Sequence, residues 1–192
     1  MALTRLPMVN AVSGTLAVVN GGTGVASGTT NQFLKFTGTT TLASAAITTG
    51  KVLQVVNSSS SSSGTVNDNN YADVGFTTSI TPSASGNPIY LHWYMPDNRI
   101  QTNNTNMNSK IYRQINGGGY SALTQTTGGT GYNGGTTMTS CGTSGVFVDS
   151  SHSTTNQIDY KLYFNSGQNV QAVKVNVDGT SHTGIMAMEI EA

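Results

Sequence analysis

Charged side chains are scarce in this chain of 192 residues. Asp, Glu, Lys and Arg together make up 8% of it, and their formal charges cancel. Globular proteins ordinarily devote about 25% of their residues to these four types. The basic residues are scattered along the sequence, and only Lys110 and Arg113 lie close together. Because affinity for nucleic acids depends on clustered Lys and Arg, we expect no nucleic-acid partner.

Cysteine and long apolar runs are also lacking. Cys141 is the single cysteine, which excludes an internal disulfide. No apolar run reaches the roughly 18 residues that a membrane-spanning helix needs, so we expect no membrane insertion. The first residues lack the basic start and long apolar core of a signal peptide. The sequence therefore favours assembly in a cytoplasm.

Catalytic motifs are missing as well. No GxSxG, CxxC or HExxH pattern occurs, and the glycines of NGGTG at 20–24 are not followed by Lys-Ser or Lys-Thr. A glycosidase needs two carboxylates across the scissile bond. Asp149 lies beside a turn-like stretch, while Glu189 and Glu191 are predicted on the outward side of the last strand. We expect a protein that is not an enzyme, with no catalytic residue.

The three histidines do not form a metal-binding pattern. His152 and His182 are predicted to be solvated loop residues, whereas His92 is predicted to be a packed strand residue. Zinc and iron sites need several N, O or S ligands in fixed geometry. We therefore expect no metal and no cofactor.

Ser, Thr, Asn and Gly supply the polar surface instead, and these residues favour turns and strand faces over helices. About eight or nine short strand patterns alternate with turn signals, as in a β-sandwich or jelly roll. The strongest is PIYLHWYM at 88–95, where large side chains on both faces predict one face toward the core and the other toward a neighbouring surface. SKIYRQIN at 109–116 is predicted to form a hairpin with YSALTQ.

Three consecutive runs near the end, residues 157–165, 169–177 and 184–191, predict an antiparallel meander. In the last run, Met186, Met188 and Ile190 are predicted to face the core. In the first run, one side of the strand is apolar throughout, with Ile158, Tyr160, Leu162 and Phe164.

Polar stretches at 58–63, 97–108 and 126–145 are predicted as loops. Tyr120 and Tyr132 lie in Gly-, Thr- and Asn-rich surroundings, where a ring can stack on a sugar while amides and hydroxyls bond to it. We therefore name Tyr120 and Tyr132 as candidate binding residues for a sugar. Local packing or a subunit interface is the alternative role for these rings.

The composition changes near residue 50. Residues 1–50 hold short apolar pieces separated by Gly, Thr and Ser, which cannot form a core alone and indicate an extended attachment segment. Residues 51–192 carry the strand patterns. The sequence therefore predicts an all-β protein, with an antiparallel β-sandwich or jelly-roll-like domain at 51–192.

Several motifs resemble structural proteins of marine and cyanobacterial phages. LAVVNGGTGVAS at 16–27 is similar to a motif common in phage tail fibres. Four further segments of the chain resemble, in order, a C-terminal domain of such proteins. These segments are GKVLQVVN at 50–57, DVGFTTSITPSASGNPIYL at 73–91, IDYKLYFNS and the final MAMEIEA.

The resemblance implies a structural protein of the virion, a fibre or fibre-tip subunit that forms a homotrimer and displays its β-sandwich to the host surface. It implies that residues 1–50 join other virion proteins, and it supplies no catalytic residue. Two alternatives stay open from sequence: a capsid decoration or head-fibre protein and, less favoured, a capsule-degrading enzyme.

Overall fold

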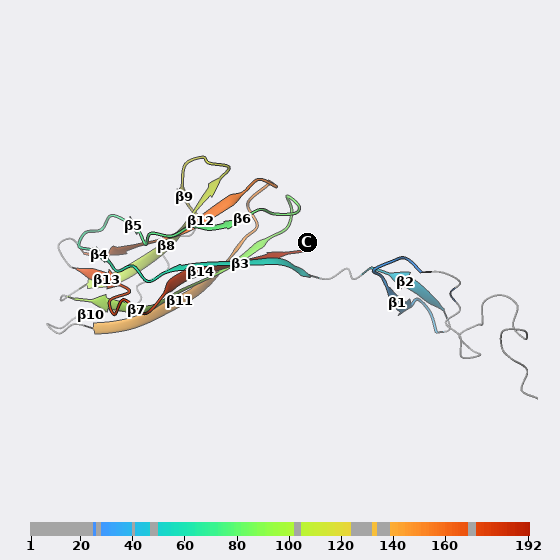
Figure 1. Cartoon of the computed structure of the whole chain (residues 1–192), viewed down its shortest axis with the longest axis horizontal. Coiled ribbons are helices and arrows are strands. Elements are labelled where there is room, and N and C mark those ends of the chain that lie inside the picture. The colour runs from blue at the N-terminus through green and yellow to red at the C-terminus, as the bar shows by residue number, and fades with distance from the viewer. Residues whose placement is uncertain are drawn as a thin grey trace, which may run out of the picture. The chain divides into compact units, whose positions relative to one another are not determined.

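The computed structural model describes residues 25, 28–39, 41–46, 50–101, 105–123, 132–133, 139–168 and 172–192 (Figure 1). Every regular element in these ranges is a β-strand, and the strands pair antiparallel, which confirms the predicted all-β class. The same ranges contain no helix with the length and apolarity to span a membrane. The chain divides into two compact units, Met1–Thr49 and Gly50–Ala192.

The first unit contains one hairpin within its described residues. Strands β1 (Phe33–Phe36) and β2 (Leu42–Ala45) pair antiparallel, with Phe33 opposite Ala45 and Phe36 opposite Leu42. All four side chains of β1 are exposed, and Phe36 is 63% exposed. A two-stranded hairpin with exposed aromatics has little independent stability. Part of the segment predicted as extended is therefore a hairpin, and residues 1–24 lie outside the described ranges.

The second unit is a sandwich of two sheets (Figure 1). One sheet runs in the order β3-β14-β7-β13-β4. Strand β11 also belongs to it and pairs with the edge of β7 that lies opposite β14. We call it the β7 sheet. Its strands are β3 (Val52–Ser60), β4 (Gly64–Val66), β7 (Ile89–Ile100), β11 (Thr139–Asp149), β13 (Val173–Val175) and β14 (Thr183–Ile190).

The other sheet, the β8 sheet, is built around β8 and β12. The remaining strands, β5, β6, β9 and β10, are short and pair with β8 or β12. Its strands are β5 (Ala72–Asp73), β6 (Thr78–Ile80), β8 (Thr105–Ile115), β9 (Ser121–Ala122), β10 (Tyr132–Asn133) and β12 (Ile158–Ser166). The pairing of Tyr112 with Ala122 confirms the predicted hairpin.

The core lies between the sheets and takes alternate residues from each. Leu91, Met95 and Ile185 from the β7 sheet are fully buried, as are Ile111 and Leu162 from the β8 sheet. The predicted apolar side of β12 is confirmed, since these four residues are at most 1% exposed: Ile158, Tyr160, Leu162 and Phe164.

Strand β7 has a bulge, which explains why residues 97–100 looked like a loop. Thr143 pairs with Met95 and Cys141 pairs with Asn98, so Pro96 and Asp97 together face one residue of β11. A bulge tolerates proline because its missing N–H breaks no regular ladder bond. The extra residue reverses the alternation, and Asn98 and Ile100 point inward. The predicted loop at 97–108 is therefore wrong: strands occupy 97–100 and 105–108.

Two other predicted loops are partly strands. Residues 58–60 of the serine tract belong to β3, where Ser58 pairs with Ile185 and Ser60 with Thr183. Residues 139–145 belong to β11. Neither segment has the large side chains that usually mark a strand; partner strands of the same sheet supply the pairing instead. The rest of the predicted loop at 126–145, apart from β10, lies outside the described residues.

The predicted meander is also wrong. Strand β12 belongs to the β8 sheet, whereas β13 and β14 each pair with β7 and not with one another. The chain thus crosses between the two sheets after β12. Turn signals show where strands end, but they do not show which partner each strand takes.

The face assigned to β14 is the reverse of the prediction. Ile185, Ala187 and Glu189 are 0% exposed, while Met186 and Met188 lie on the outward side. Both sides of this strand carry apolar residues, so alternation alone does not select between them. The inward carboxylate of Glu189 is accommodated because four hydrogen bonds reach it.

Candidate functional site

The two tyrosines named from sequence lie far apart along β8. Tyr132 forms β10 and pairs with Asn106, near the start of β8; its side chain is outside the described residues. Tyr120 is half-buried and its ring lies beneath the Nζ of Lys161, 5.0 Å from the ring centroid. Since Lys161 pairs with Tyr112, about six residues or 20 Å of strand separate the two positions. They do not form one site.

Tyr120 belongs instead to a cluster on the outward side of the β8 sheet. Opposite residues in an antiparallel pair project from the same face, and Lys161 faces Tyr112 while Tyr163 faces Lys110. Together they make a polar aromatic surface. We call it the tyrosine face, and it comprises Tyr71, Asp73, Lys110, Tyr112, Tyr120, Lys161 and Tyr163.

Ring and cation contacts fix the geometry of the tyrosine face. The Tyr112 and Tyr163 rings are 4.2 Å apart between centroids and tilted by 36°. Lys110 Nζ lies 4.5 Å from the centroid of the Tyr71 ring. Contacts of this kind hold long side chains in place, so the face is preorganised before any ligand arrives.

The two lysines of this face differ electrostatically. Lys161 Nζ lies 2.6 Å from the Asp73 carboxylate, and this hydrogen bond raises the pKa of Lys161. Among the described residues, Lys110 has no carboxylate within ion-pair distance. Burial is the main cause of the raised pKa of the nearby Tyr163 hydroxyl. This hydroxyl therefore stays protonated and can donate a hydrogen bond. The face therefore combines hydroxyls and rings with a lysine, Lys110, that rests on the Tyr71 ring and has no carboxylate partner among the described residues.

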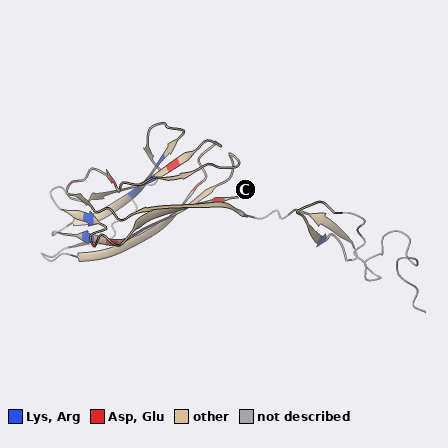
Figure 2. Cartoon of the chain, in the orientation of Figure 1, with Lys and Arg blue, Asp and Glu red and all other residues tan. Residues whose placement is uncertain are grey.

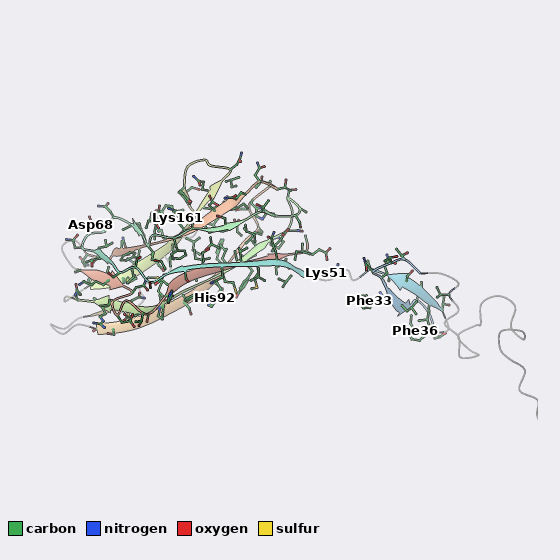
Figure 3. The ribbon with its side chains drawn as sticks, viewed as in Figure 1. Phe33, Phe36, Lys51, Asp68, His92 and Lys161 are labelled. Carbon is green, nitrogen blue, oxygen red and sulfur yellow. The ribbon has the colours of Figure 1, made fainter. Side chains whose placement is uncertain are left out.

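Amides continue the tyrosine face along the same two strands. Asn108 Nδ2 donates to Asn165 Oδ1 at 3.0 Å, and Asn106 Nδ2 donates to Asn108 Oδ1 at 2.9 Å. Asn165 is buried and its amide is bonded at both ends within the protein, whereas Asn106 and Asn108 are half-buried. Rings that stack on sugar faces beside half-buried amides are elements of a carbohydrate contact. Lys161 of the tyrosine face and His92 of the β7 sheet belong to different sheets of the sandwich (Figure 3).

The outward side of the β7 sheet has a different character. The strand registers place Val55, Met188, Tyr90 and Val148 in one row across β3, β14, β7 and β11. The next row, two residues along, contains Asn57, Met186, His92 and Val146. We call this surface the apolar face, defined as Val55, Tyr90, His92, Val146, Val148, Met186 and Met188.

Valines of the apolar face are exposed in the single chain: Val55 by 52%, Val146 by 57% and Val148 by 50%. The prediction that residues 88–95 turn one side outward is met by Tyr90, His92 and Tyr94, which are half-buried. His92 and Tyr94 contact each other, with centroids 6.2 Å apart. His92 therefore contributes to a surface and is not packed in the core.

The buried titratable groups have internal partners. Arg113 Nη1 lies 2.7 Å from Asp149 Oδ1, and the Tyr160 hydroxyl donates to Asp149 Oδ2 at 2.8 Å. Burial by itself raises the pKa of Asp149, but hydrogen bonds from Arg113, Tyr160 and Ser151, with the charge of Arg113, hold it below its ordinary value. This carboxylate is thus a stabilised anion, and it does not lie on either outward face.

His152 differs from its prediction as a solvated residue. It is 3% exposed, and its Nε2 lies 2.8 Å from the carbonyl oxygen of Asn87. The contact joins the stretch after β11 to the stretch before β7.

Within the described ranges, no three His, Cys, Asp or Glu residues gather closely enough to hold a metal ion. Figure 2 shows how thinly the charged residues are distributed.

No family model and no curated protein matches this chain. Among solved structures, an infectious bursal disease virus Gx strain structure is similar over 82% of this chain and 36% of that chain, with 13% identity and a TM-score of 0.43. The VP2 subviral particle of that virus gives 82% and 42% coverage, 11% identity and a TM-score of 0.42.

A third similar structure is Eiger TNF from S. frugiperda, over 73% of this chain and 94% of that chain, with 10% identity and a TM-score of 0.36. The chain spans less than half the length of the viral chains it resembles. At these scores the likenesses carry no argument about function.

Proposed function

We propose that this chain is a non-enzymatic structural subunit of a bacteriophage particle, in a fibre or fibre tip, and that its tyrosine face contacts a host-surface glycan. The observation that carries the contact is the gathering of Tyr112, Tyr120 and Tyr163 with Lys110 and Lys161 on one outward face. The ordered phage-like motifs of the sequence support the place in a virion.

The two fully buried carboxylates, those of Asp149 and Glu189, have structural roles. Asp149 is bound by Arg113 and Tyr160, and Glu189 is bound by residues of a neighbouring loop. A catalytic acid or base has to reach a substrate, and a carboxylate enclosed by its own protein cannot do so without losing these bonds. Binding repeated over several copies makes weak contacts effective, which suits a displayed sandwich.

The test replaces the stacked pair, in particles that carry Tyr112→Ala and Tyr163→Ala. Adsorption to the host should fall by about tenfold or more, because each lost ring removes roughly 1 kcal/mol or more of stacking per copy. Tyr112→Phe with Tyr163→Phe is the matched control, since it keeps both rings. The measurement is the fraction of unadsorbed particles over time, together with the thermal midpoint of each purified protein.

Normal adsorption by the alanine variant, with normal assembly, would overturn the glycan contact at this face. Tyr120→Ala should add to the loss because its ring lies under Lys161. Locating the chain on the intact particle by electron microscopy distinguishes a fibre from the decoration protein that the sequence left as an alternative. Residues 1–50 are proposed as the attachment segment in either position.

A further inference from the structure

The apolar face has the layout of a subunit interface. Its centre consists of the two rows that run from Val55 and Asn57 to Val148 and Val146, and it contains no Asp, Glu, Lys or Arg. Charged groups lie at both ends. Interfaces between subunits commonly have an apolar, aromatic and methionine-rich centre inside a polar rim.

The rim contains both signs of charge at each end. Lys51 and Glu191 form an ion pair of 3.0 Å beyond the start of β3 and the end of β14. Asp97 and Arg99, 3.8 Å apart, lie beyond the bulge of β7. A neighbouring copy that carries the same mixed rim would meet no excess of like charge. Since the formal net charge of the chain is zero, copies also do not repel one another as a whole.

The size of the face suits the centre of an interface. The four strands lie side by side over six residues of β7, 89–94, and at about 3.4 Å per residue and about 4.8 Å between strands they give an outward surface of about 400 Å². A standard interface buries about 800 Å² on each partner. The face therefore supplies about half of that area.

We propose that the apolar face is the surface through which copies of this chain associate, its occupant being a neighbouring copy of the same chain. In the homotrimer that the phage resemblance implies, three such faces turn toward a common axis, and one part of each face meets a different part of the next copy's face. This contact removes the half-exposed valines from water. The inference does not depend on the glycan contact, which belongs to the opposite sheet. His92, in the second row, becomes buried in the assembly.

The test measures the mass of the full-length protein in solution by light scattering across a range of concentrations. Wild type should give about 60 kDa, three chains of 19.9 kDa. Val146→Lys with Val148→Lys places two charges in the centre of the face and should raise the dissociation constant by at least about a hundredfold. Ser79→Lys is the control, on an exposed strand position of the other sheet.

A monomeric wild type at high micromolar concentration overturns the proposal, and so does a trimer that the two lysines leave intact. If the lysine variant is unfolded by circular dichroism, Val146→Thr with Val148→Thr decides, because it keeps the β-branched shape. Weaker assembly of the threonine variant supports the interface; an unchanged dissociation constant overturns it. Because none of these substitutions lies on the tyrosine face, failure here is distinct from failure of the glycan contact.

Discussion

Glu189 shows how one residue can reverse the face expected for a strand. Its carboxylate is 0% exposed and accepts hydrogen bonds from the Ser83 backbone and hydroxyl, Asn87 Nδ2 and Gln54 Nε2, all at 2.6–2.7 Å. Burial alone raises the pKa of Glu189, but these bonds outweigh it and lower the pKa to about 2. The carboxylate joins the loop before β7 to β3 and β14.

Acid should therefore weaken the fold through Glu189. The pKa of this group is about 2 when folded and 4.5 ordinarily, so its contribution is complete above pH 4.5 and is lost as the pH falls from 4.5 to about 2. Glu189→Gln should lower the free energy of unfolding by about 1–3 kcal/mol at neutral pH and flatten its decline in that window. Urea titrations at a series of pH values measure both effects.

Glu191→Gln is the matched control for that prediction. Its ion pair with Lys51 is exposed, and exposed pairs contribute about 0–1 kcal/mol. If the two glutamine variants lose equal stability and keep the same acid response, Glu189 does not have the role described.

Strand β11 depends on a glycine to fit against β7. Gly145 pairs with Trp93, and an added Cβ would overlap the indole ring of Trp93 on the inward side. The indole fills the space that a side chain at position 145 would need. The Gly, Ser and Thr content that made this stretch look like a loop is thus partly a packing requirement of a neighbouring strand.

Gly145→Ala should destabilise the sandwich by about 1–3 kcal/mol, since the ring or the strand has to move. Gly119→Ala is the control, because an added Cβ there meets no atom within 4 Å. Thermal unfolding followed by tryptophan fluorescence, which reports on the single tryptophan, measures the difference. Equal midpoints for the two variants would show that the Trp93 packing adapts without cost.

At the scale of the whole molecule, the chain divides into the units Met1–Thr49 and Gly50–Ala192. The core that is described belongs to the second unit, with residues from both of its sheets. The β1–β2 hairpin of the first unit leaves its phenylalanines exposed. A hairpin of this kind gains stability by packing on a partner.

Deletion of residues 1–48 should accordingly leave a folded β domain that no longer enters particles. Circular dichroism and a cooperative thermal transition report on folding, and immunoblots of purified particles report on incorporation. The full-length chain expressed in the same way is the reference. An unfolded truncation would place the first unit in the core, and normal incorporation would remove its role in attachment.

The sequence by itself determined the all-β class and the inward side of β12, because scarce helix formers and a clean alternation of apolar residues leave few alternatives. Hairpin β8–β9 followed from its glycines. Partner choice, the bulge at Pro96, the inward Glu189 and the separation of Tyr120 from Tyr132 were decided only by the tertiary structure. The physical reason is that strand alternation specifies two faces, while the pairing partner and hydrogen bonds from distant loops select which face is buried.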